Sequence, residues 1–278
     1  MKRTLGFTLI IITIVWACSK VPISNRKQLL LVSDSEMNQQ ALVSYKAFLD
    51  TNRVINNSNN NTQMVNRVGE RIARAATQYF NDIKHPEYLN GYKWEFNLVE
   101  DKQVNAWCMP GGKVVVYTGL LSVTQNESGL ATVMGHEISH AIAKHGAERV
   151  SQQYAAQGLL VGGQVALGVA NANKSPLSQN IWNSAFNVVA PVAANVALLR
   201  YSRQHESEAD HLGLIFMAIA GYDPKEAVTF WGRMAEASKN SQKPPVLLST
   251  HPSDQQRIAD LQKLLPDAEK YYVKSNMR

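Results

Sequence analysis

The sequence predicts an α+β fold that is mainly helical, with a small β-sheet and hairpin beside one central helix. Two observations predict this class. Apolar residues recur with helical spacing through most of the 278-residue chain, whereas strand-like patterns are confined to residues 92–99 and 113–117. Hydrophobic residues make up 45% of the chain, which is enough for the core of one sizeable domain.

The amino terminus has the composition of a secretory signal. A short basic start precedes an apolar run over residues 4–17 that is too short to span a bilayer comfortably. The run ends at Ala17-Cys18, which resembles the cleavage site of a bacterial lipoprotein signal peptide. We expect residues 1–17 to be removed, Cys18 to carry lipid and residues 18–32 to form a tether. An ordinary cleaved signal and an uncleaved anchor are the alternatives.

Residues 33–278 are expected to form the folded domain. Helix starts are identified by capping residues, helix ends by glycine or proline, and strands by short apolar runs. In chain order, we expect helices over residues 33–50 and 62–80, strands near 92–99 and 113–117, a helix capped by Asn126, a helix carrying residues 203–210, a new helix after Gly221–Pro224 and a final helix over 253–265.

Residues 154–200 are rich in Ala, Val, Leu and Gly and are nearly free of charge. A transmembrane helix is one interpretation. However, the apolar stretches are short, and the second is broken by Pro191 and Asn195. We therefore expect helices that cover a cleft, or a lid.

The stretch His136-Glu137-Ile138-Ser139-His140 indicates a hydrolytic metal site. Positions i and i+4 lie on one helix face, roughly 6 Å apart, so His136 and His140 can share one Zn²⁺ per chain. Glu137 is turned away from that pair, but it can take a proton from a water at the metal and pass it to a leaving amine. Coincidence, with two exposed histidines, is the alternative.

A hydrolytic zinc requires a third protein ligand. Glu206 and Asp210 lie one turn apart on the helix that carries residues 203–210. If Glu206 binds the metal, Asp210 is placed to accept the other ring N–H of His136 or His140.

Four nearby residues are not expected to bind the metal. Glu208 is expected to be a solvated surface residue, and His205 and His211 lie on other helix faces. His145 is about 180° around the helix from His136, so we expect it to pack or cap the helix end.

Four motifs together carry a family resemblance. His136-Glu137-x-x-His140 followed by Glu206-x-x-Ala-Asp210 resembles the M48 metallopeptidases. Residues 105–121 resemble the Asn-Ala to Pro-Gly-Gly hairpin of that family, and Ser249-Thr250-His251-Pro252 resembles its Ser-Thr-His-Pro loop. The likeness spans about residues 25–265 and implies a zincin-like metallopeptidase fold.

The resemblance also implies a role for each matched residue. His136, His140 and Glu206 become zinc ligands, Glu137 the general base and acid, and Asp210 the orienting carboxylate. The strand at Asn105 and Ala106 becomes an edge that binds an extended peptide. His251 either stabilises the oxyanion or caps the metal in a resting state, unless it is a simple turn residue.

The expected partners are polypeptides and, through Cys18, a membrane. The resemblance suggests misfolded or unassembled proteins of a bacterial cell envelope as substrates, with the enzyme on the outer membrane facing the periplasm. The formal charge of +6 is scattered, so nucleic acid is not expected as a partner. The rivals are a chaperone-like binding lipoprotein with structural or latent zinc, and a zinc hydrolase of non-peptide substrates.

Overall fold

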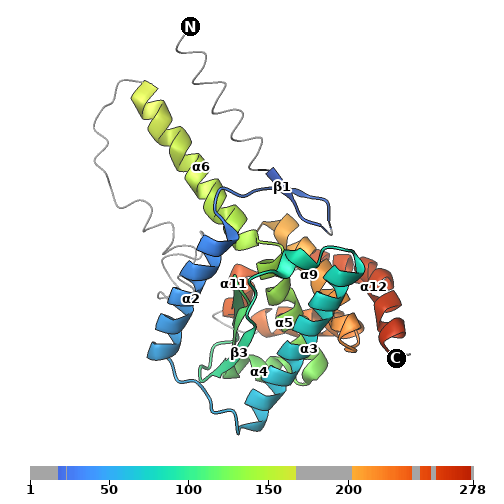
Figure 1. The fold of residues 1–278 in the computed structure, drawn as a ribbon. Coiled ribbons are helices and arrows are strands. Elements are labelled where there is room, and N and C mark those ends of the chain that lie inside the picture. Colours follow the sequence, from blue (N-terminus) through green and yellow to red (C-terminus); the bar gives the residue numbers. More distant parts are fainter. Residues whose placement is uncertain (1–17, 23, 167–201, 240–244, 252–254, 277–278) are drawn as a thin grey trace.

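The computed structural model describes residues 18–22, 24–166, 202–239, 245–251 and 255–276. The predicted signal peptide and most of the predicted lid lie outside these residues. Within them, helices predominate around one small sheet (Figure 1). The helices are α2 (Asp34–Thr51), α3 (Asn60–Asp82), η1 (Pro86–Leu89), α4 (Thr118–Thr124), α5 (Glu127–Ile142), α6 (His145–Ala166), α9 (Arg203–Ile219), α10 (Lys225–Lys239), α11 (Val246–Thr250) and α12 (Gln255–Asn276). The strands are β1 (Cys18–Lys20), β2 (Lys27–Leu29), β3 (Glu95–Val99), β4 (Ala106–Met109) and β5 (Lys113–Tyr117).

The central sheet has the order β3-β5-β4. Strand β5 pairs in parallel with β3 and antiparallel with β4, and every residue of β5 is buried. Gly111 and Gly112 form the β4–β5 turn with φ of 79° and 84°, a backbone region that glycine enters without strain. Strand β4 is an edge strand in the described part of the sheet, and it packs against α5.

Helices α5 and α9 cross closely at the centre of the molecule. A Cβ on Gly213 of α9 would lie 3.0 Å from the backbone nitrogen of His136, and one on Gly135 of α5 would lie 3.1 Å from the Gly213 carbonyl oxygen. The two glycines therefore allow the backbones to approach more closely than larger residues would. This crossing brings the histidines of α5 beside the acidic residues of α9.

The predicted elements agree with the structure except in five places. Helices η1, α4 and α11 were not predicted. Helix α12 was predicted to stop at Leu265, but it continues through Pro266 to Asn276 and buries Ala268. The tether predicted for residues 18–32 is in part the hairpin β1–β2, and Val21 between its strands is only 1% exposed. An apolar anchor of this kind holds the segment on the domain.

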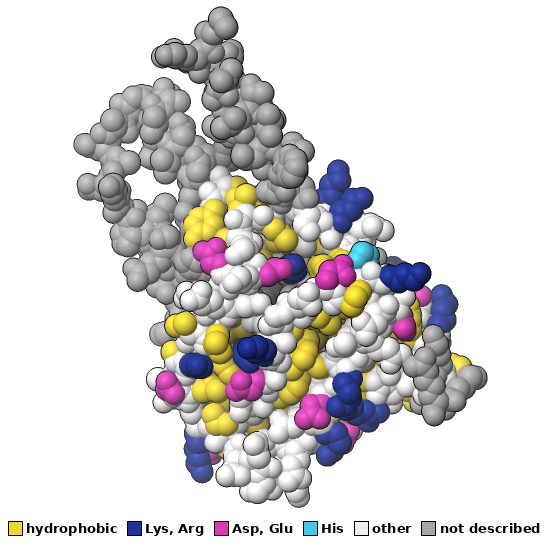
Figure 2. Space-filling model, viewed as in Figure 1, with side chains coloured by type: hydrophobic (Ala, Val, Ile, Leu, Met, Phe, Trp, Pro, Cys, Tyr) yellow, Lys and Arg dark blue, Asp and Glu magenta, His cyan; other side chains and the backbone are white. Residues whose placement is uncertain are grey.

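Charges of both signs share the surface. On the face drawn in Figure 2, Lys and Arg side chains are interspersed with Asp and Glu. Among the described helices, none combines the length and the apolar character needed to cross a bilayer.

Candidate metal centre

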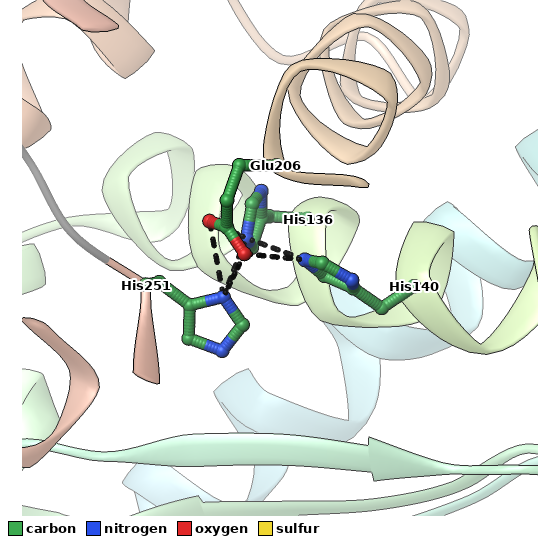
Figure 3. Close-up of side chains that lie close together, drawn as sticks. All are labelled: His136, His140, Glu206 and His251. Carbon is green, nitrogen blue, oxygen red and sulfur yellow. Dashed lines mark hydrogen bonds and ion pairs between the residues drawn. The ribbon is translucent and has the colours of Figure 1, made fainter. Parts of the chain in front are cut away.

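Four buried side chains meet where α5, α9 and α11 come together (Figure 3). They are His136 and His140 of α5, Glu206 of α9 and His251 at the end of α11. One ligand atom from each lies within 4.8 Å of all the others. His136 Nε2 is 3.0 Å from His140 Nε2 and 3.4 Å from Glu206 Oε2. The structure therefore brings together the three residues predicted as zinc ligands.

Capping residues determine where the two helices of this group begin. The Asn126 side chain caps α5 by accepting from the Gly129 N–H at 2.7 Å, so the helix begins where the capping residue predicts. Ser202 caps α9 in the same way, through the N–H of His205. The Ser202 cap lies four residues before Glu206, and the Asn126 cap lies ten and fourteen residues before His136 and His140.

His251 completes the group from a different direction. Its Nδ1 lies 3.0 Å from Glu206 Oε1 and 3.1 Å from His136 Nε2. The Leu247 N–H of α11 donates to the Val104 carbonyl at 3.2 Å. Val104 lies just before β4, so this bond holds α11 beside that strand. His251 is 3% exposed, so its position at the metal centre differs from that of a solvent-facing turn residue.

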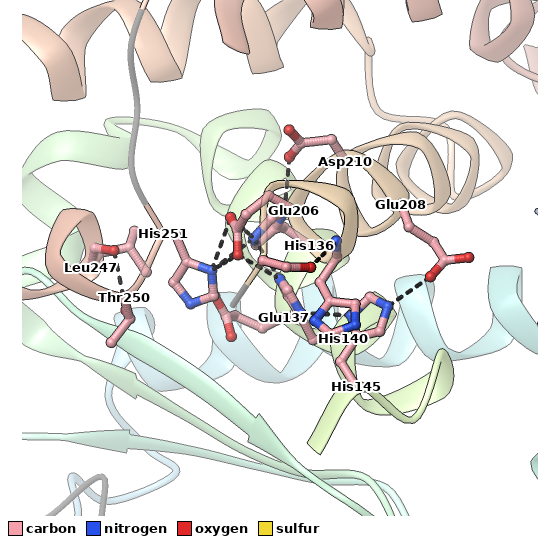
Figure 4. Close-up of polar contacts among 12 residues, drawn as sticks. His136, Glu137, His140, His145, Glu206, Glu208, Asp210, Leu247, Thr250 and His251 are labelled. Atoms are coloured by element: carbon pink, nitrogen blue, oxygen red, sulfur yellow. Dashed lines mark hydrogen bonds and ion pairs between the residues drawn. The ribbon is translucent and has the colours of Figure 1, made fainter. Parts of the chain in front are cut away.

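Asp210 contacts His136 as predicted. One carboxylate oxygen lies 2.9 Å from His136 Nδ1, which leaves Nε2 of that ring directed at the group (Figure 4). Arg257 of α12 holds Asp210 through two hydrogen bonds of 2.9 and 2.7 Å, and its guanidinium lies 3.5 Å from the ring centroid of Trp231. Arg257 was not predicted, because only the tertiary fold brings α12 against α9.

The prediction of a solvated Glu208 was wrong, whereas His145 lies outside the metal-ligand group and packs at a helix end as expected, although it also contacts His140. His145 Nδ1 lies 2.9 Å from His140 Nδ1, and His145 Nε2 lies 2.8 Å from Glu208 Oε2 (Figure 4). Glu208 is 7% exposed rather than solvated. The helical angle from His136 to His145 does not apply, because α5 ends at Ile142 and Lys144 has a φ of 57° before α6 begins.

The other histidines of α9 lie outside the group, as expected. His205 Nε2 contacts Glu148 at 3.0 Å, and His211 Nε2 contacts Asp267 at 2.9 Å. Neither ring belongs to the metal-ligand group found among the described residues.

Glu137 has the environment of an acid–base group. It is 4% exposed, and its Oε1 has no hydrogen-bond partner among the described residues, although His251 Nε2 lies 3.4 Å away. Burial raises the pKa of Glu137 to about 7. A divalent cation nearby would favour the charged form and lower that pKa.

The donor set fits a zinc ion. Two imidazole nitrogens and a carboxylate oxygen are a ligand set that hydrolytic zinc sites use. Both imidazoles of α5 also bond through their other ring nitrogen, His136 to Asp210 and His140 to His145, as ligands of zinc usually do.

The predicted peptide-binding edge lies beside this group, since Cys108 of β4 and His140 line one small cavity. The Asn105 carbonyl already accepts from the Tyr117 N–H at 3.1 Å, so its backbone faces β5. Because facing alternates along an antiparallel pair, Ala106 and Cys108 turn their N–H and C=O groups outward. The backbone groups at the edge are therefore those of Ala106 and Cys108, and not those of Asn105.

Comparison with known proteins agrees with this geometry. The model of peptidase family M48 matches residues 59–265. The mitochondrial metalloendopeptidase OMA1 of Schizosaccharomyces pombe is 34% identical over 252 residues, covering 90% of this chain and 67% of that protein. OMA1 of Saccharomyces cerevisiae is 34% identical over 68% of this chain and 52% of its own length. The beta-barrel assembly-enhancing protease of Escherichia coli is 31% identical over 72% of this chain.

The relatives are longer than the region that matches this chain. That region spans about half of the Saccharomyces cerevisiae protein and 38% of the Escherichia coli protein. Residues 59–265, which the family model matches, contain the metal-ligand group and make up most of the chain. The chain belongs to peptidase family M48 and is a metalloendopeptidase.

Proposed function

We propose that this protein is a zinc endopeptidase in which His136, His140 and Glu206 hold one Zn²⁺ and Glu137 is the general base and acid. The proposal rests on the convergence of the three ligand atoms beside Glu137, whose buried Oε1 has no hydrogen-bond partner in the part of the chain that the structure describes. Zinc in such a site lowers the pKa of water towards neutrality and polarises a carbonyl group.

The proton transfers and the orientation of the ligands are assigned to side chains of this protein. Glu137 takes a proton from the attacking water and delivers it to the leaving amine. Asp210 holds the His136 ring by accepting its Nδ1–H. His251 either stabilises the oxyanion or occupies a ligand position in a resting state, and its short distances to Glu206 and His136 support a place at the metal.

An extended peptide is the substrate that the edge of β4 accommodates. The outward backbone groups of Ala106 and Cys108 are placed to pair with a peptide strand beside His140. This edge favours peptide cleavage over hydrolysis of a non-peptide substrate.

The location is proposed from the amino terminus, and the natural substrates from a bacterial relative. We place the protein in a bacterial cell envelope, tethered by a lipid on Cys18 to the outer membrane and facing the periplasm. The signal-like residues 1–17 support this location. We further propose misfolded or unassembled envelope proteins as substrates, which is supported by the likeness to the beta-barrel assembly-enhancing protease of Escherichia coli.

A chaperone-like lipoprotein with a structural zinc is the second candidate. The observation in its favour is His251, which gives the group four protein donors, the number typical of structural zinc sites. Glu137 opposes it, because a structural site has no use for an adjacent buried base.

Digestion of casein tests the two candidates directly. We expect cleavage by the purified protein, loss of cleavage after chelation and recovery when zinc is added back. Binding of unfolded casein without cleavage, in protein that contains zinc, would support the chaperone-like alternative instead.

A further inference from the structure

A chain of buried hydrogen bonds leads from the metal centre to the amino-terminal hairpin. It runs from His140 to His145 at 2.9 Å and from His145 to Glu208 at 2.8 Å (Figure 4). Glu208 then accepts from Arg26 Nε at 2.9 Å and from the Ser24 hydroxyl. Ser24 and Arg26 lie between β1 and β2. The loop between these strands therefore contacts Glu208, which is linked through His145 to the metal-site residue His140.

The direction of the protons along this chain follows from its charged end. An ionised carboxylate only accepts, so His145 donates its Nε2–H to Glu208. Nδ1 of a neutral His145 then accepts the Nδ1–H of His140. This arrangement leaves the lone pair on His140 Nε2 directed at His136 and Glu206. The network therefore selects the tautomer of His140 that a metal ion requires.

Arg26 is held in this network by a second carboxylate. Glu148 of α6 lies 2.9 and 2.8 Å from the two terminal nitrogens of Arg26 and also contacts His205 at 3.0 Å. The side chains of Arg26, Glu148 and Glu208 are only 10%, 6% and 4% exposed. Without Arg26, two buried carboxylates would lose the cation between them, and such an uncompensated buried charge is strongly unfavourable.

We propose that His145 and Glu208 are positioning residues for the metal ligand His140, and that the hairpin of residues 18–29 fixes Glu208 through Arg26. This inference rests on the proposed zinc site. Under this proposal, the segment directly after Cys18 helps to orient the metal ligand His140, in addition to any role as a tether. Removing such a partner of a histidine ligand typically weakens metal binding by about 10- to 100-fold.

Zinc affinity of the full folded domain tests the proposal without an activity assay. The variants are His145→Ala, Glu208→Gln and Arg26→Met. Two matched controls are His211→Ala, a histidine of α9 that bonds Asp267, and Arg67→Met, an arginine that pairs with Glu127. The zinc dissociation constant is measured by competition with a chelator, the visible spectrum is recorded with Co²⁺, and the melting temperature is measured on metal-free protein.

We expect His145→Ala to raise the zinc dissociation constant about 10- to 100-fold and to change the Co²⁺ spectrum. Glu208→Gln and Arg26→Met should move the constant in the same direction by smaller factors, while the controls match wild type. A purely structural network would lower the melting temperature of metal-free protein but leave the dissociation constant and spectrum unchanged.

Equal zinc affinity of the folded network variants and the controls would overturn the proposal. If His145→Ala does not fold, His145→Phe decides the matter, because its ring fills the same space without the two nitrogen atoms. Unchanged affinity in that variant overturns the proposal. Wild-type protein that binds no zinc would instead refute the proposed function, and with it this inference.

Discussion

Glu206 is the residue that joins two helices far apart in the sequence into one metal site. Its carboxylate oxygens lie 3.4 Å from the Nε2 atoms of both His136 and His140. We expect Glu206→Ala to lose zinc during dialysis against a chelator that wild type withstands, because two imidazoles alone bind the ion weakly. Metal analysis of the dialysed proteins checks this, with Glu226→Ala as the control. Unchanged zinc content would point to a different third ligand.

His251 tests how many protein donors the ion has. If its Nδ1 binds zinc, His251→Ala should keep zinc through the three remaining donors but show one histidine fewer in the X-ray absorption spectrum. An unchanged spectrum would place His251 outside the coordination sphere. Casein cleavage by the same variant assigns the role: a rise marks a resting-state cap, and a fall marks an oxyanion donor.

The residues of the site differ in how far the sequence could predict them. His136, Glu137 and His140 form a motif that carries its own helical geometry, and Asp210 follows from Glu206 by one turn. The contact between His145 and His140 was missed, because it depends on the turn at Lys144. Arg257 was missed because it reaches Asp210 from a helix 47 positions further along the chain.

At the scale of elements, the close crossing of α5 and α9 determines the distance between the histidines and Glu206. Gly213→Ala should push the helices apart, because its Cβ would lie 3.0 Å from the His136 backbone nitrogen. We expect a destabilisation of about 1–3 kcal/mol, together with weaker zinc binding. Gly232→Ala of α10 is the matched control, since its Cβ would contact nothing within 4 Å. That variant should be as stable as wild type or up to about 1 kcal/mol more stable. Denaturant unfolding and chelator competition measure both effects, and equal behaviour of the two variants would contradict this account.

The edge of β4 gives a second prediction at this scale. Cys108→Pro removes an outward N–H, whereas Cys108→Ala keeps it. We expect the proline variant to lose up to about 10-fold in kcat/KM for an unfolded protein, the worth of one hydrogen bond. The alanine variant should cleave like wild type, and zinc content should be equal in both. Equal kinetics in the two variants would show that this edge does not bind the peptide.

The sequence predicted best those elements that are marked by a local feature, such as a capping residue or a short apolar run. Helix α5 begins after its predicted cap, and β5 occupies the predicted residues 113–117. The carboxyl-terminal half of α12 was missed, because Pro266 reads as a helix end, yet burial of Ala268 favours continuation. The hairpin β1–β2 was missed because its stability comes from Val21 in the distant core and from Arg26 between two carboxylates.

At the scale of the whole molecule, the helical α+β class with a small sheet was predictable from periodicity, but the way in which three helices meet at one point was not. That meeting depends on the pair Gly135 and Gly213 and on the packing of α12 against α9. The family motifs supplied the missing long-range information, because they specify which distant residues converge.

The most direct test of the central claim is a comparison of wild type with Glu137→Gln, in which zinc content and casein cleavage are measured on the same samples. The glutamine variant is isosteric but lacks the base. We predict about one zinc per chain in both proteins, with cleavage lower by about 10²- to 10⁴-fold in the variant. Cleavage by the zinc-loaded variant at the wild-type rate would contradict the assignment of Glu137, and with it the proposed mechanism.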